Sequence, residues 1–153
     1  MEIKIESSAF KNEGMIPSKY TCDGENVSPQ LTWVEPPADT KSFALISDDP
    51  DAPGGTFVHW VVYNISPDAR ELPENVKIKA ISPDAVEGTT HFGEEGYGGP
   101  CPPSGIHRYY FKIYALDATL ELKPGAGKNV LLKAMEGHIL AKGELMGKYS
   151  RKR

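Results

Sequence analysis

Two aspartates, two histidines and a tyrosine are the residues of this chain best suited to chemistry. Asp49 and Asp51 flank a proline, and His59 follows them closely. His107 and Tyr109 stand two positions apart, much later in the chain. A nearby carboxylate favours the charged form of an imidazole, and charged imidazoles and tyrosine hydroxyls donate hydrogen bonds to anions. We therefore predict that the two segments fold into one small pocket that binds a phosphate-like anionic group, with the aspartates orienting the histidines.

A simple turn is the competing interpretation of the first segment. Residues 49–55 consist of Asp, Pro, Ala and Gly, and Asp, Pro and Gly are the residues that turns favour. His59 follows Asp51 by only eight residues, and two inward-facing histidines together with Tyr109 and the two aspartates favour a site over a turn.

Four β-branched and aromatic runs predict the strands that position these residues. The apolar run 43–46 is typical of a strand buried on both faces. We expect strands at residues 30–34, 42–47, 57–65 and 106–116, the last being the longest.

The alternation of side chains along a strand predicts which way each residue faces. His59 should share a core-directed face with three neighbours on its strand, namely Phe57, Val61 and Tyr63. His107 and Tyr109 should likewise face inward. Arg108 should point away from the pocket, where we expect it to pair with a carboxylate.

A long loop and one helix complete the predicted architecture. Residues 82–105 are rich in Gly and Pro, and a loop of that length usually serves function. If its backbone amides point inward, the pocket needs no lysine to hold a phosphate. Helical spacing of apolar side chains predicts an amphipathic helix after an N-cap at Asn129, and the basic run 148–153 is interpreted as its solvated end. The positions with that spacing are Leu131, Ala134, Met135, His138 and Leu145.

Composition narrows the class of protein. The 153 residues suit a single domain over 1–153, and the net charge of −4 argues against nucleic-acid binding. No apolar run approaches the ~20 residues of a membrane span, and residues 1–6 do not resemble a signal peptide, so we expect a cytoplasmic protein. Cys22 and Cys101 are either free thiols or one disulfide, and they form no CxxC pair for zinc.

Several blocks of sequence resemble the phosphatidylethanolamine-binding protein family, in particular its bacterial and archaeal branch described as Raf-kinase-inhibitor-like. No block is decisive alone, but together they cover nearly the whole chain in the order of the family. The blocks are YTCDGENVSP at 20–29, DPDAP at 49–53, HWVV at 59–62, GYGGP at 96–100, GIHRY at 105–109 and MEGHIL at 135–140.

The resemblance implies a mainly β fold, with two antiparallel sheets and a C-terminal α-helix packed against them. It also implies a pocket for phosphate, acetate, cacodylate or phosphorylethanolamine head groups. The implied ligand-binding residues are Asp49, His59, His107 and Tyr109, with Asp51, Gly99 and Pro100 shaping the rim. Implied partners are a phosphorylated or anionic small molecule, such as a phospholipid head group, and a kinase or protease. No cofactor or catalytic residue is expected.

Two enzymatic hypotheses stand beside non-enzymatic binding. His59, His107 and Asp49 have the ligand types of a two-histidine, one-carboxylate metal site, although no tight metal-binding spacing supports it. Ser104 or Cys101 near His107 could serve a hydrolase, but the chain has no G-x-S-x-G motif. The binding hypothesis predicts tighter binding as the pH falls towards ~6, near the ordinary pKa of histidine.

Overall fold

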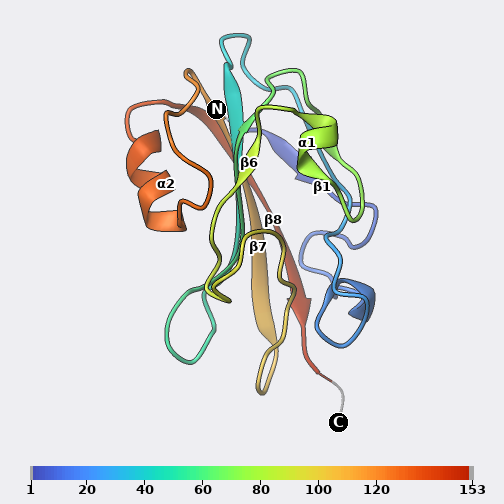
Figure 1. Cartoon of the computed structure of the whole chain (residues 1–153). Helices are drawn as coiled ribbons and strands as arrows, with labels where there is room; N and C mark the ends of the chain where they lie inside the picture. The colour runs from blue at the N-terminus through green and yellow to red at the C-terminus, as the bar shows by residue number, and fades with distance from the viewer. Residues whose placement is uncertain (1, 152–153) are drawn as a thin grey trace.

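The computed structural model describes residues 2–151 and consists mainly of antiparallel β-structure (Figure 1). This confirms the predicted fold class. In chain order its elements are β1 (Lys4–Glu6), the 3-10 helix η1 (Ser18–Tyr20), β2 (Leu31–Val34), β3 (Ser42–Asp49), β4 (Phe57–Ile65), β5 (Glu71–Leu72), α1 (Ile78–Ile81), β6 (Val86–Glu87), β7 (His107–Leu116), α2 (Lys128–Met135) and β8 (Ile139–Tyr149).

The larger sheet has five strands in the order β6-β4-β3-β7-β8. Its centre is β3, whose eight residues are all buried because they are covered by neighbouring strands and by packing on both faces. The predicted buried strand is therefore confirmed, and it extends two residues further, to Asp49. The strands predicted at 57–65 and 106–116 correspond to β4 and β7.

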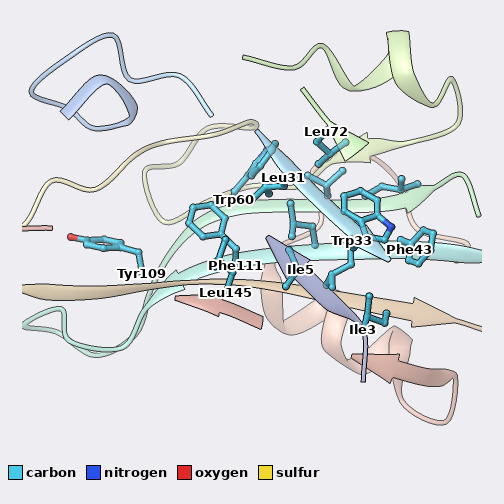
Figure 2. Packing of buried hydrophobic residues seen from close by; sticks show 14 of the residues in the cluster. Ile3, Ile5, Leu31, Trp33, Phe43, Trp60, Leu72, Tyr109, Phe111 and Leu145 are labelled. Carbon is cyan, nitrogen blue, oxygen red and sulfur yellow. The ribbon is translucent and has the colours of Figure 1, made fainter. Parts of the chain in front are cut away.

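The smaller sheet has the order β1-β2-β5 and packs over one face of the larger one. Apolar side chains of both sheets form the main core, of which Figure 2 shows a part. Its largest fully buried side chains include Trp33, Trp60, Tyr109, Phe43 and Phe111. Burying this much apolar surface is the main force that holds the two sheets together.

Helix α2 lies on the opposite face of the larger sheet (Figure 1). Leu131 and Met135 are buried there against β3 and β4. Asp48 at the end of β3 receives ion pairs from Lys128 of α2 at 2.7 Å and from Lys112 of β7 at 3.4 Å. Two contacts therefore hold the helix on the sheet: its apolar side, and the ion pair between Lys128 and the buried carboxylate of Asp48.

The predicted extent of this helix is wrong, because the helix ends at Met135 and the chain continues as β8. Gly137 has a φ of 80°, which turns the chain out of the helix. His138 and Leu145 therefore do not belong to the helix, and the cap position is Gly127 rather than Asn129.

The basic run at the end of the chain also differs from the prediction. Lys148 lies in β8, paired with Arg108, and not at a helix end, while residues 152–153 lie outside the described part of the chain. With eleven residues, β8 is longer than β7, which was predicted to be the longest strand. An alternating series explains the strand, since positions 141, 145, 147 and 149 are buried and the positions between them are more exposed.

Within residues 2–151, no helix is long and apolar enough to cross a membrane.

Candidate functional site

A cavity of about 330 Å³ opens where the end of β3 meets the starts of β4 and β7. Antiparallel pairing brings these three strand ends to one edge of the sheet, as the pairing of Asp49 with Phe57 shows. The cavity is lined by Asp49, Ala52, Pro53, Phe57, His59, Phe92, Cys101, Pro102, Pro103, His107 and Tyr109.

A larger groove of about 1170 Å³ runs along β1 and β8. Its lining residues are mostly Lys, Glu and aliphatic side chains, with no histidine, cysteine or aspartate among them. The smaller cavity contains both histidines, Asp49 and Tyr109, so the candidate site is assigned there.

His59 reaches the cavity through an irregularity in β4. Trp60 pairs with Ser47 and Val58 pairs with Asp48, which leaves His59 as an extra residue between two paired positions. Such a bulge re-aims side chains, and here His59 and Trp60 both turn towards the main core. The predicted face of His59 is therefore wrong in part. Phe57 lies beside it, with 5.0 Å between ring centroids, but Val61 and Tyr63 belong to the opposite face.

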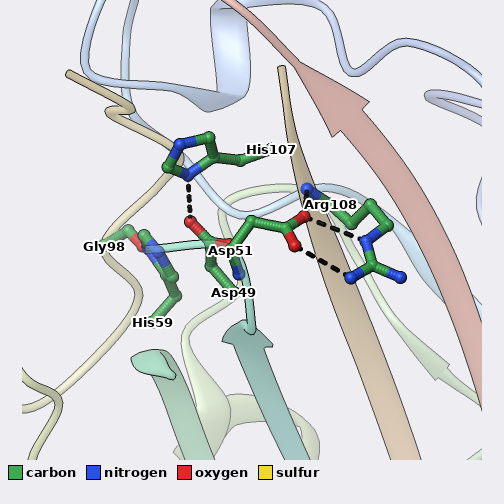
Figure 3. Close-up of polar contacts among 6 residues, drawn as sticks. All are labelled: Asp49, Asp51, His59, Gly98, His107 and Arg108. Atoms are coloured by element: carbon green, nitrogen blue, oxygen red, sulfur yellow. Dashed lines mark hydrogen bonds and ion pairs between the residues drawn. The ribbon is translucent and has the colours of Figure 1, made fainter. Parts of the chain in front are cut away.

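The imidazole of His59 is held by the backbone of the long loop. Its Nδ1 lies 2.7 Å from the carbonyl oxygen of Gly98 (Figure 3). Burial lowers the pKa of His59 below its ordinary value, although this hydrogen bond opposes the effect. His59 is consequently neutral at pH 7.

His107 is held by a carboxylate instead. Its Nδ1 lies 2.6 Å from Oδ2 of Asp49, and both side chains are almost fully buried (Figure 3). The other oxygen of Asp49 accepts a hydrogen bond from the backbone N–H of Asp51 at 2.7 Å. Asp49 therefore orients His107, as predicted, and both of its oxygens are occupied.

Asp51 does not orient a histidine. Its carboxylate binds Arg108 through Nε at 2.9 Å, Nη2 at 2.8 Å and the backbone N–H at 2.9 Å (Figure 3). These bonds with Arg108 lower the pKa of Asp51 to about 2. The expectation that Arg108 pairs with a carboxylate is confirmed, and Asp51 fixes the start of β7 rather than lining the cavity.

Tyr109 lies between the two histidines on the cavity wall. Its ring centroid is 5.2 Å from that of His59 and 6.4 Å from that of His107. The hydroxyl is buried, and within residues 2–151 it has no hydrogen-bond partner. Burial first, and the charge of Asp49 second, raise the pKa of Tyr109 above its ordinary value, so the group stays a neutral donor.

The glycine- and proline-rich loop forms one wall. Cys101 lines the cavity and forms a disulfide with Cys22, so the two cysteines are not free thiols. Gly99 and Pro100 lie behind that wall. The Gly99 N–H donates to Asn26 Oδ1 at 2.9 Å, and the Pro100 carbonyl accepts from the Cys22 N–H at 3.1 Å. They hold the loop in place and do not line the cavity.

The structure brings together four of the residues singled out from the sequence, namely Asp49, His59, His107 and Tyr109. Several lining residues were missed, because apolar side chains such as Phe57, Phe92 and Pro102 carry no chemical signature in the sequence. Gly98 was also missed as the partner of His59, although the GYGGP block contains it. That these residues bind a ligand stays a prediction.

The donor sets of the two enzymatic hypotheses are incomplete. No group of three or more His, Cys, Asp or Glu in residues 2–151 is arranged to hold a metal ion, and Asp49 already serves His107. Cys101 is part of the disulfide with Cys22 and therefore has no free thiol. Within the same residues no hydrogen bond joins Ser104 to His107, whose Nδ1 contacts Asp49 instead.

Comparisons with known proteins agree with this architecture. A family model described as phosphatidylethanolamine-binding protein matches residues 6–150. A UPF0098 protein of Methanothermobacter thermautotrophicus is 53% identical over 150 residues, which cover 97% of this chain and 99% of the relative. The crystal structure of a Chlamydia trachomatis protein, described as a phosphatidylethanolamine-binding protein homologue, has a TM-score of 0.92 at 44% identity and covers 99% of both chains. Escherichia coli YbcL, described as a new member of the mammalian family, has a TM-score of 0.91 at 32% identity and covers 99% of this chain and 100% of its own.

Proposed function

We propose, from the fact that this chain belongs to the phosphatidylethanolamine-binding protein family, that its cavity binds a small phosphate-like anionic group without turning it over. The groups that would contact the anion are His59, His107 and Tyr109. Asp49 would act through His107, and Asp51, Gly99 and Pro100 would keep the walls of the site in place.

The observation that carries this proposal is the buried Tyr109 hydroxyl with no hydrogen-bond partner in residues 2–151. A buried polar group without a partner costs about 1–3 kcal/mol, so such groups usually have a role. This hydroxyl lies beside two imidazoles on the wall of a cavity. An oxyanion in the cavity would supply its missing acceptor.

The cavity has the size for a small head group and a mostly apolar wall. Its volume of about 330 Å³ lies at the small end of the range for ligand sites, and Phe57, Phe92 and Pro102 contribute the apolar part. Among residues 2–151, no lysine or arginine lines it. Within that part of the chain, the cavity wall can gain positive charge only by protonation of the imidazoles, which limits its affinity for free anions at neutral pH.

Titration calorimetry with inorganic phosphate and O-phosphorylethanolamine tests the proposal. Tyr109→Phe should weaken binding about 10-fold or more, as expected for a lost hydrogen bond to a charged group. Tyr110→Phe is the matched control, because Tyr110 is the next residue of β7 and belongs to the opposite face. Equal affinities of the wild type and Tyr109→Phe, or no binding to the wild type at millimolar ligand, would refute the proposal.

A protein partner and a cellular location complete the proposed function. A kinase or protease as partner rests on the family alone, and a pull-down with the ligand present and absent would test it. We propose the cytoplasm as the location. Disulfides are more usual in oxidising compartments or in hyperthermophiles, so the disulfide makes fractionation of native cells a decisive check. Recovery in an extracytoplasmic fraction would exclude the cytoplasm.

A further inference from the structure

We propose that the cavity selects anions that carry a proton, such as hydrogen phosphate, over equally shaped anions that carry none, such as sulfate. This inference rests on the proposed function and specifies the ligand class of the same site. It follows from the positions of hydrogen atoms on the two imidazoles.

The partners of His59 and His107 fix which ring nitrogen carries the hydrogen. Nδ1 of His59 faces a carbonyl oxygen, and Nδ1 of His107 faces a carboxylate oxygen. A carbonyl and an ionised carboxylate can only accept, so both Nδ1 atoms must donate. In a neutral imidazole the other nitrogen, Nε2, then has a lone pair and no hydrogen.

Both Nε2 atoms are therefore acceptors whenever their rings are neutral. The hydrogen bonds to Gly98 and Asp49 that hold the two rings are both made by Nδ1, and both rings line the cavity. In Figure 3 the second nitrogen of His107 points away from Asp49. When both rings are neutral, an anion without a proton would meet two lone pairs, with the Tyr109 hydroxyl as the donor beside them.

The surrounding charges do not change this balance. The carboxylate of Asp49 in β3 contacts His107 at 2.6 Å, and Asp49 and Asp48 of the same strand both act on His59 through space. Arg108 of β7 is neutralised by Asp51. The loops contribute the Gly98 carbonyl, the backbone of Gly99 and the disulfide sulfur of Cys101. The Gly99 N–H already donates to Asn26, and the other two groups have no proton to give. His91 stacks edge-on against the far side of Phe57, and its Nδ1 accepts from the Val58 N–H, while Tyr149 of β8 acts on Tyr109 only through space.

Two routes can supply the missing hydrogen. The ligand can bring it, and its O–H then donates to an Nε2 lone pair. Otherwise one ring must take a proton from solution, after which Nε2–H donates to the anion. Since burial keeps His59 neutral, the second route is costly at high pH. Hydrogen phosphate has the proton at pH 8, whereas sulfate does not.

Calorimetric titration of the whole chain with inorganic phosphate and with sulfate tests this selectivity. Measurements at pH 8 and pH 7, each in two buffers of different ionisation enthalpy, give the affinity and the number of protons taken up. At pH 8 phosphate should bind about 10- to 100-fold more tightly than sulfate, which corresponds to one charge-assisted hydrogen bond. Sulfate binding should take up close to one proton and strengthen by up to about 10-fold from pH 8 to pH 7, while phosphate binding should change less.

A glutamine in place of His59 would provide a hydrogen-bond donor that does not depend on pH. His59→Gln places an amide nitrogen with its own hydrogens near the position of Nε2, so the variant should bind sulfate more tightly at pH 8 and with less proton uptake. His138→Gln is the control, because Nδ1 of His138 also contacts an oxygen acceptor, Oδ1 of Asp117 at 2.7 Å, but on the exposed surface. This control should leave both affinities unchanged.

The outcomes separate the two proposals. Sulfate binding within about 3-fold of phosphate at pH 8, or sulfate binding without proton uptake, would overturn the selectivity and leave anion binding intact. Binding of neither anion to the wild type would overturn the proposed function itself. The proton count needs only the wild-type protein, so a variant that fails to fold does not affect the test.

Discussion

Reduction of the disulfide between Cys22 and Cys101 is expected to lower the melting temperature by about 6–14 °C. The two cysteines are 79 positions apart, and closing a loop of that length in the unfolded chain corresponds to roughly 4.5 kcal/mol of stabilisation. Removal of a native disulfide typically costs about 2–5 kcal/mol, and the smaller of these values sets the lower limit of the expected shift in melting temperature. The unfolding entropy of a 153-residue chain is about 0.32 kcal/mol per kelvin, and this value converts the free energies into the stated range.

Thermal melting followed by circular dichroism, with and without a phosphine reductant, measures the effect. Both cysteines are exposed, so the reductant can reach them, and a thiol count confirms that reduction is complete. The double variant Cys22→Ser/Cys101→Ser is the control, since its lower melting temperature should not respond to reductant. Two free thiols together with a shift below about 2 °C would refute the loop-closure argument, because the bridge would then not constrain the unfolded chain.

Three further substitutions test the site and its supports. Asp51→Asn should lower the free energy of unfolding between pH 4 and 7 by about 1 kcal/mol, a value discounted because Arg108 is half exposed, and acid unfolding should show it. In the wild type, the stabilisation from this ion pair is fully present above the ordinary aspartate pKa of 3.8 and is lost as the pH falls through about 2. The free energy of unfolding of the variant should therefore fall less between pH 4 and pH 2 than that of the wild type. Gly99→Ala should cost about 1–3 kcal/mol in urea unfolding, because its Cβ would lie 2.2 Å from the Tyr20 carbonyl oxygen. Tyr109→Phe should leave the empty protein as stable as the wild type or more stable by up to about 1 kcal/mol in the same assay, since it removes an unpartnered buried hydroxyl.

The central strands could be predicted because their sequences have only one good structural solution. The run Phe43–Ile46 is apolar on both faces, and only a central strand buries both. The position of the pocket could also be predicted, from the way in which antiparallel strands are connected. Antiparallel neighbours bring the end of one strand to the start of the next, so Asp49 and His59 had to lie at the same edge.

Strand β8 could not be recognised, because its buried series includes glycines. Gly143 and Gly147 pass so close to the N-terminal segment that a Cβ would lie 1.9 Å from the Ile3 carbonyl oxygen and 2.5 Å from the Ile16 side chain, respectively. Gly147 is buried and Gly143 is partly buried, and both are covered by contact with another segment, although neither has a side chain to mark it as apolar. A pattern based on apolar residues therefore skipped them and joined Leu145 to the helix before it.

The bulge at His59 was hidden for a related reason. Strict alternation places Phe57, His59 and Val61 on one face, and the sequence gives no sign that one extra residue interrupts the pairing. The bulge puts His59 and Trp60 on the same side of the strand, so Val61 lies on the opposite face. The alternation therefore holds from Phe57 to His59 and fails beyond His59.

The roles of the two aspartates show how the cavity keeps its polar groups available. Asp51 is bound by Arg108, and Asp49 is bound by His107 and by a backbone N–H. These bonds fix the positions of both carboxylates, and through Asp49 they fix the ring of His107. The Tyr109 hydroxyl, in contrast, is buried without a hydrogen-bond partner in residues 2–151, beside the rings of His59 and His107 on the cavity wall. The supporting bonds are therefore part of the proposed site, because they position the groups that would touch the ligand.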